Sequence, residues 1–125
     1  MFDLNYVHDK ELLYRGIQLF AYETLQSRIT SAAFKGQPGE PTSVDRDGQR
    51  PEDEIVASLQ RKLPEIKAIV TIFTGFCREI GVIVTASPHP SNKYHADIRE
   101  SMDKEKICKS KLIKLSKKAI IVKKY

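Results

Sequence analysis

Cysteine and long apolar runs are both scarce in this chain. The sequence contains two cysteines, Cys77 and Cys108, and neither belongs to a CxxC or other metal-spaced pair. Such cysteines indicate reduced thiols in an intracellular protein, more often buried than reactive. No apolar run approaches the roughly 20 residues that cross a bilayer, and the N-terminus has no basic region followed by an apolar stretch. We therefore expect a cytoplasmic protein without a membrane partner.

The sequence also lacks the short motifs of well-known sites. It has no GxxxxGK[ST] or GxGxxG phosphate loop, no GxSxG or HExxH motif and no Cys–His nucleophile pattern. The three histidines have no recognised ligand spacing, and the aspartates of VDRDG do not form a calcium loop. The sequence therefore predicts no metal and no cofactor, and it leaves open whether the protein is an enzyme.

Length and composition predict one globular domain that spans residues 1–125. The chain has 125 residues, of which 41% are hydrophobic and 30% charged, an ordinary balance for a single domain. A chain of this length buries about two-thirds of its unfolded surface, so it needs no disulfide or metal to fold. Its hydrophobic patterns predict an α+β fold with a mixed central sheet and two main helices.

The two main helices are predicted at Pro51–Leu63 and Asp103–Ala119. In the first, acidic residues follow Pro51, and Ile55 and Leu59 repeat at helical spacing. In the second, an apolar stripe is surrounded by lysines. A short helix is predicted at 74–81, ended by a glycine. Strands are predicted at 28–34, 42–46, 68–73, 82–86, 93–100 and 119–122.

Several strand predictions carry a further expectation about position. Residues 68–73 and 82–86 are apolar on both faces, which is typical of central strands. Residues 28–34 and 42–46 could pair as an antiparallel hairpin with a long loop. The segment 11–20 allows either a strand or the start of a helix. As a strand it would place Arg15 among aliphatic side chains, and a buried arginine must be paired or bind an anion.

One polar strand face is the first candidate site. Alternation in KYHADIRE places His95, Asp97 and Arg99 on the same face of a half-exposed strand. Histidine can exchange a proton near neutral pH, and arginine can hold a phosphate or carboxylate. His95 and Asp97 are therefore the catalytic candidates. The alternative is an edge strand that shows mixed charges to water and so blocks pairing with other strands.

Other candidates for anion binding lie outside that strand. In PHPSN, two prolines stiffen the chain around His89, although the same residues could simply make a turn. Short hydroxyl side chains together with arginine could cradle an anion, or the small residues could pack within strands. The anion-binding candidates are Arg15, Arg46, Arg99, Ser31, Ser43 and His89.

Positive charge is concentrated in residues 101–125. This segment has nine lysines against Asp103 and Glu105, a formal charge of +7; since the whole chain carries +5, residues 1–100 carry −2. Such asymmetry indicates a polyanion or an acidic protein as the partner, whereas the alternative is a lysine-rich face kept for solubility. The candidate polyanion surface consists of Lys109, Lys111, Lys114, Lys117 and Lys118.

Residues 14–98 resemble a set of small bacterial proteins for which no activity is established. The resemblance is carried by YRGI, RITSAAF, TSVDR and the proline-rich turn before HADI. It implies no function, but it includes Arg15, Ser31, Ser43, Arg46 and His95. LYRGI followed by a TS segment is also similar to mono-ADP-ribosyltransferase-like folds, whose later glutamate motif this sequence lacks.

These features lead to three functional hypotheses. The first is a small binding or accessory protein that engages a polyanion, either nucleic acid or nucleotide, or an acidic protein. The second is an enzyme acting on a nucleotide or phosphodiester, with His95 as general acid or base and with Arg15 and Arg46 stabilising phosphate charge. The third is a structural subunit of a larger complex, docked through its lysine-rich helix.

Overall fold

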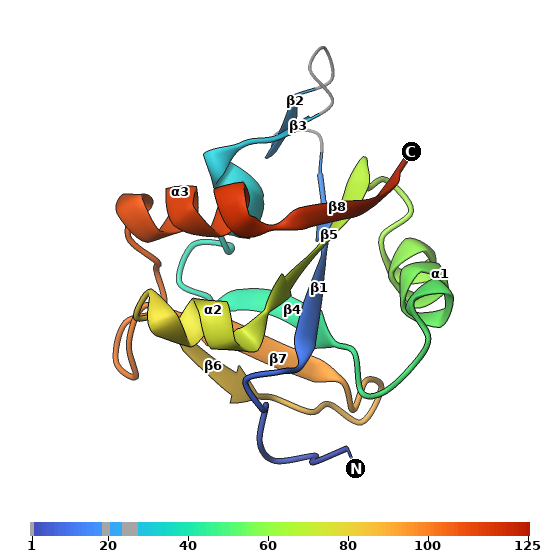
Figure 1. Ribbon diagram of the computed structural model, residues 1–125, viewed down its shortest axis with the longest axis horizontal. Coiled ribbons are helices and arrows are strands. Elements are labelled where there is room, and N and C mark those ends of the chain that lie inside the picture. The colour runs from blue at the N-terminus through green and yellow to red at the C-terminus, as the bar shows by residue number, and fades with distance from the viewer. Residues whose placement is uncertain (1, 19–20, 24–27) are drawn as a thin grey trace.

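A six-stranded antiparallel sheet organises the chain (Figure 1). The computed structural model describes residues 2–18, 21–23 and 28–125. The predicted α+β class with two main helices is confirmed, and every strand pairing in the described part is antiparallel. The strand order is β6-β7-β4-β1-β5-β8. The strands are β1 (Leu12–Ile17), β4 (Thr42–Arg46), β5 (Ala68–Phe73), β6 (Ile83–Ala86), β7 (His95–Arg99) and β8 (Ile120–Lys124).

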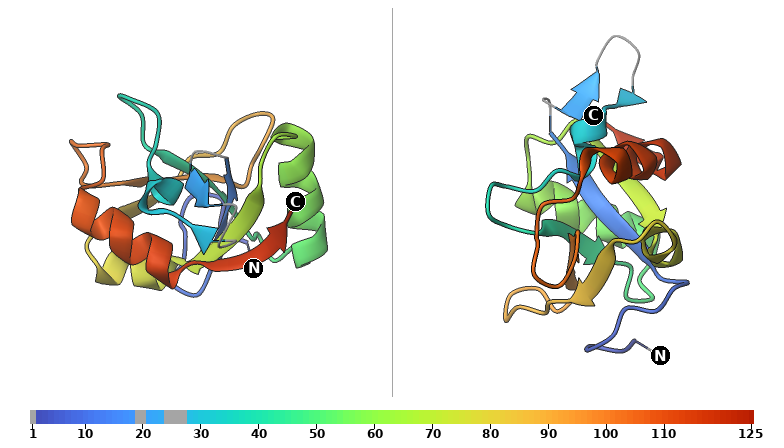
Figure 2. Two further views of the ribbon diagram at one scale, coloured as in Figure 1. Left: turned by 90° about the horizontal axis from the view of Figure 1, so that it is seen from above. Right: turned by 90° about the vertical axis from the view of Figure 1, so that its left-hand side faces the viewer.

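The larger core lies on one face of this sheet. Two α-helices, α2 (Thr74–Glu79) and α3 (Lys109–Lys118), and a 3-10 helix, η2 (Ser31–Phe34), cover that face (Figure 2). Alternate residues of the strands point into this core, among them Leu13 and Ile98, which are at most 1% exposed. Burial on this face is the main source of stability, at about 25 cal/mol for each Å² of apolar surface.

The opposite face has only partial helical cover. Helix α1 (Glu52–Lys62) packs there on β1 and β5, and its Ile55 and Leu59 meet Tyr14 and Ile69 in a second, smaller core. That core includes no residue of β4, β6 or β7. The β4–β7 part of this face carries polar side chains instead.

Helix α1 begins and ends as its sequence predicts. Pro51 is the N-cap residue, three acidic residues fill the first turn, and Arg61 and Lys62 occupy the last turn. This arrangement places negative charge at the positive end of the helix dipole and positive charge at the negative end. The short helix and strand that follow are also confirmed, since α2 ends before Gly81, which adopts a φ of 91°.

The predicted strand at 28–34 and its hairpin with 42–46 are wrong. Within this segment only Arg28–Ile29 forms a strand, β3, which pairs with β2 (Tyr22–Glu23) in a separate two-stranded sheet. The chain then turns into η2 because the Thr30 side chain accepts a hydrogen bond from the Ala32 amide and caps the helix. Strand β4 is confirmed, but its neighbours are β1 and β7.

Two strands lie at positions in the sheet that differ from those their sequence patterns predicted. The apolar segment 82–86 forms β6, which is an edge strand rather than a central one. The alternating segment forms β7, which lies inside the sheet between β6 and β4. The apolar side chains of β6 reflect burial in the larger core, where α2 packs on the strand and Val84 is 5% exposed, and this burial does not require a second neighbouring strand. The alternative that β7 is a charged edge strand is therefore wrong.

The C-terminal segment forms a helix followed by the last strand. Helix α3 is shorter than predicted, since it starts at Lys109, and residues 101–107 form a loop anchored by the buried Ile107. Strand β8 pairs with β5 and forms the second edge of the sheet. The segment 11–20 contains the strand β1, whereas residues 19 and 20 lie outside the described residues. No helix in the described ranges has the length and apolarity to cross a membrane.

Candidate functional site

Strands β4 and β7 bring polar side chains from distant parts of the sequence onto one face. In the antiparallel register Asp45 lies opposite His95, and Ser43 lies opposite Asp97. Arg99 is two residues further along β7 than Asp97 on the same face, opposite Ile83. The predicted grouping of His95, Asp97 and Arg99 is thus matched by a strand-paired row from β4.

Two adjoining hollows open on this polar face. The first has a volume of about 310 Å³ and is lined by β1, β4, the end of α1 and the loop before β4; it contains Asp45, and we call it the Asp45 hollow. The second has a volume of about 380 Å³ and contains Arg99, and we call it the Arg99 hollow. Both are lined by Glu40, Pro41, Ser43 and His95, so together they form one site, the His95 cleft.

His95 lies where the two hollows meet. Its Nδ1 is 3.1 Å from the carbonyl oxygen of Ser87 and 3.9 Å from Asp97 Oδ1. Because a carbonyl oxygen only accepts hydrogen bonds, the neutral ring donates from Nδ1, which leaves Nε2 as the acceptor. The ring of the exposed His89 packs against it, with centroids 4.4 Å apart. His95 therefore has the tautomer that a base acting through Nε2 requires.

Asp45 is a functional candidate that the sequence reasoning missed. The residue is 5% exposed, and its Oδ1 accepts a hydrogen bond of 3.1 Å from Asn92. Its Oδ2 is buried and has no hydrogen-bond partner; Lys62 Nζ approaches to 3.5 Å as an ion pair without donating one. A buried carboxylate oxygen without a donor is costly. Asp45 thus presents an unfilled acceptor at the wall of its hollow.

Arg99 has a buried donor without an acceptor, the reverse of Asp45. Its Nε is buried and has no hydrogen-bond partner. Within residues 2–18, 21–23 and 28–125 no carboxylate forms an ion pair with it, although Asp97 and Glu105 line the same hollow. Arg99 is thus the arginine of the site that stays open to an anion.

Arg15 holds the sheet together instead of offering its guanidinium group to a ligand. It donates three hydrogen bonds to main-chain oxygens, from Nε to Ala33 at 2.7 Å, from Nη1 to Ser43 at 2.6 Å and from Nη2 to Lys35 at 3.2 Å. Burial lowers the pKa of Arg15 to about 10. The bond to Ser43 bridges a gap between β1 and β4, whose register contains only the pairs Leu13–Arg46 and Tyr14–Asp45. The bonds to Ala33 and Lys35 tie β1 to the end of η2.

Arg46 is fully enclosed and cannot contact a ligand. It is 0% exposed, and it donates from Nε and Nη2 to the two carboxylate oxygens of Glu11 at 3.0 and 2.9 Å. Further bonds reach the carbonyl oxygens of Leu4 and Tyr6. The sequence identified Arg46 as a phosphate ligand, but the structure gives it this internal role. The enzyme hypothesis therefore loses its two predicted phosphate arginines.

The remaining predicted residues are divided between the cleft and other positions. Ser43 is exposed and lines both hollows, and His89 lines the Arg99 hollow. Ser31 is the first residue of η2, is exposed, and lines neither hollow. No cluster of metal-ligating side chains occurs among the residues that the structure describes.

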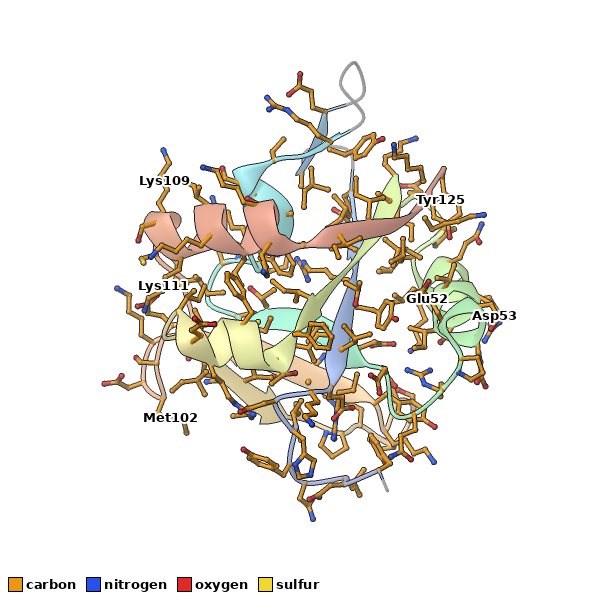
Figure 3. The ribbon with its side chains drawn as sticks, in the orientation of Figure 1. Glu52, Asp53, Met102, Lys109, Lys111 and Tyr125 are labelled. Carbon is orange, nitrogen blue, oxygen red and sulfur yellow. The ribbon has the colours of Figure 1, made fainter. Side chains whose placement is uncertain are left out.

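The predicted polyanion surface is divided in a similar way. Lys111 donates to Glu100 Oε2 at 2.7 Å and to the carbonyl oxygen of Gly81 at 3.2 Å, so it joins α3 to the body of the domain. The hydrogen bond between them lowers the pKa of Glu100 and raises that of Lys111. Figure 3 shows Lys109 at the outer end of α3. The exposed lysines of α3 and β8 are Lys109, Lys114, Lys117, Lys118, Lys123 and Lys124, and we call them the basic edge.

The chain was compared with known proteins at three levels. No family model, no curated protein and no solved structure matches it.

Proposed function

We propose that the chain binds nucleic acids through the basic edge, by contacts between lysines and backbone phosphates. One observation carries the proposal. None of these six exposed lysines has a carboxylate within 4.0 Å among the described residues, whereas Lys111 of the same helix is paired. Unpaired lysines along a helix and the adjoining strand form the kind of positive surface that attracts a polyanion.

Helix stability does not account for the whole basic edge. Lys117 and Lys118 occupy the last turn of α3, where positive charge is favourable, and lysines on β8 discourage pairing at the sheet edge. Lys109, however, is the first residue of α3, and the first turn has no acidic residue. A cation at that end opposes the helix dipole by about 0.3–1 kcal/mol. A phosphate ligand explains its presence better than helix stability does.

The expected binding mode follows from lysine chemistry. Lysine contacts phosphate as a point charge, so affinity should depend on salt and only weakly on base sequence. Each phosphate contact to a duplex contributes roughly −0.9 to the slope of log affinity against log salt concentration. The protein should therefore bind unrelated sequences with similar affinity.

The test is fluorescence anisotropy with labelled single- and double-stranded oligonucleotides at increasing NaCl concentration. The triple variant Lys114→Gln, Lys117→Gln and Lys118→Gln should make the duplex slope shallower by roughly 2.7, from three contacts of about 0.9 each. Its matched control removes three positive charges elsewhere, in Lys10→Gln, Arg61→Gln and Lys93→Gln.

Three results would reject the proposal. They are an absence of binding at low salt, an affinity that does not change with salt, and an equal loss in the control variant. Binding of polyglutamate without binding of any oligonucleotide would instead assign the basic edge to an acidic protein partner. In that case the hypothesis of a subunit in a larger complex would take its place.

A further inference from the structure

The two ends of the His95 cleft have opposite and unmet hydrogen-bonding needs. At one end Asp45 Oδ2 is buried and accepts no hydrogen bond, with Lys62 Nζ 3.5 Å away as an ion pair, and at the other end Arg99 Nε is buried without an acceptor. Native proteins leave few buried polar groups unpaired, and each one needs an explanation. A single ligand with a donor group at one end and an anionic group at the other would satisfy both.

Strand geometry sets the length of that ligand. Asp45 is paired with His95, and Arg99 is four residues further along β7 on the same face. At about 3.3 Å per residue, the two ends are separated by about 13 Å along the strand. A nucleoside 5′-phosphate is similarly extended, since the N–H donors of its base and its phosphate lie at opposite ends of the molecule.

The walls between these ends fit the middle of such a ligand. The Asp45 hollow has apolar walls from Ile17, Leu59 and Leu63, which suit the faces of a base. Halfway along, Ser43 lies opposite Asp97, so a hydroxyl and a carboxylate are available to hydroxyl groups of a sugar. Along the strands, the acceptor on Asp45 is therefore followed by the pair Ser43 and Asp97, which can bind a sugar, and then by the cation of Arg99.

We propose that the His95 cleft binds a nucleoside 5′-monophosphate, with a base N–H on Asp45 and the phosphate on Arg99. A single phosphate is favoured over a triphosphate because Asp97 and Glu105 line the Arg99 hollow and repel additional negative charge. His95 contributes Nε2 as an acceptor at the junction of the two hollows. The site is distinct from the basic edge, because none of the six lysines of the basic edge lines either hollow.

The test is isothermal titration calorimetry with AMP, GMP, CMP and UMP. At least one of them should bind, and the corresponding nucleoside and ribose 5-phosphate should each bind at least tenfold more weakly. The triphosphate of the same base should also bind more weakly. Asp45→Asn and Arg99→Gln should each weaken the monophosphate at least tenfold, because each removes one of the two end contacts.

Matched controls are Asp53→Asn and Arg61→Gln, which remove the same charges from exposed positions of α1. Circular dichroism establishes that all four variants fold, and the comparison of ligands on the unaltered protein needs no variant. Failure of all four monophosphates to bind, or equal binding by the cleft variants and the controls, would overturn the proposal. The triple lysine variant should retain monophosphate binding, so the two proposals can fail independently.

Discussion

Replacement of Arg46 by methionine tests whether this arginine is structural. The substitution removes the cation that pairs with Glu11 and the donors to the carbonyl oxygens of Leu4 and Tyr6. Breaking a buried ion pair by removal of one partner costs about 3–5 kcal/mol, because the other charge stays buried. Domains of this size have free energies of unfolding of about 5–15 kcal/mol, so Arg46→Met should lose a large part of its free energy of unfolding.

The double variant Glu11→Leu/Arg46→Met separates the buried charge from the lost packing. With both charges absent, the uncompensated carboxylate disappears, and replacement of a buried pair by apolar residues is often close to neutral. The Gly48 amide also loses its acceptor on Glu11, at 3.3 Å, so a residual loss of about 1 kcal/mol is expected. The double variant should therefore be more stable than Arg46→Met alone.

Urea denaturation followed by circular dichroism measures these differences. Arg46→Lys serves as a milder variant if Arg46→Met does not fold, because lysine keeps the positive charge beside Glu11. This variant should still be less stable than the unaltered protein, because one ammonium group cannot reach both Glu11 oxygens and two carbonyl oxygens. A loss of less than about 1 kcal/mol in the free energy of unfolding of Arg46→Met would refute the structural role of the ion pair between Arg46 and Glu11. That role would also be refuted if the losses of the single variants simply added in the double variant.

Two further predictions concern titration and reactivity. Burial and the hydrogen bond to Glu52 raise the pKa of Tyr14 from 10.0 to about 12; the stability that depends on its protonated form is complete below pH 10 and is lost as the pH rises toward 12. Alkaline titration of unfolding should show this loss, of at most about 2–3 kcal/mol, as the difference between the unaltered protein and Tyr14→Phe, because Arg15 titrates over the same pH range in both proteins. Burial raises the pKa of the Cys77 thiol to about 12, so a thiol-specific disulfide reagent at pH 8 should modify the half-buried Cys108 quickly and Cys77 only after unfolding. Rapid modification of both thiols in the native protein would contradict this.

The periodicity of apolar residues in the sequence correctly predicted α1 and the polar face of β7, which depend on residues within a single helix or strand. Helix α1 was clear from its repeat of Ile55 and Leu59, its proline and its acidic first turn, because all of these act within one element. The polar face of β7 was likewise predicted, since alternation along a strand requires no knowledge of its neighbours. The segment 28–34 was misread because its short, small residues fit a strand and a 3-10 turn equally well, and the Thr30 cap decided between them.

The contents of the candidate site depended on pairing between distant segments. Asp45 belongs to the site only because β4 pairs with β7, and the sequence does not specify which strands become neighbours. The roles of Arg15 and Arg46 were also set at long range, by main-chain oxygens of another segment and by Glu11. The sequence indicated correctly that a buried arginine needs a partner, but it could not distinguish an internal partner from a ligand.

The gap that Arg15 bridges also divides the sheet into two halves. On one side β1 pairs with β5 over six consecutive residues, whereas β1 and β4 share only two registered pairs before they separate. The strands β6, β7 and β4 therefore form one ladder, and β1, β5 and β8 form another, with the side chain of Arg15 completing the junction. Local opening of a protein follows its least connected boundary. Widening of this junction would change the Asp45 hollow, which β1 and β4 both line, while each ladder keeps its own hydrogen bonds.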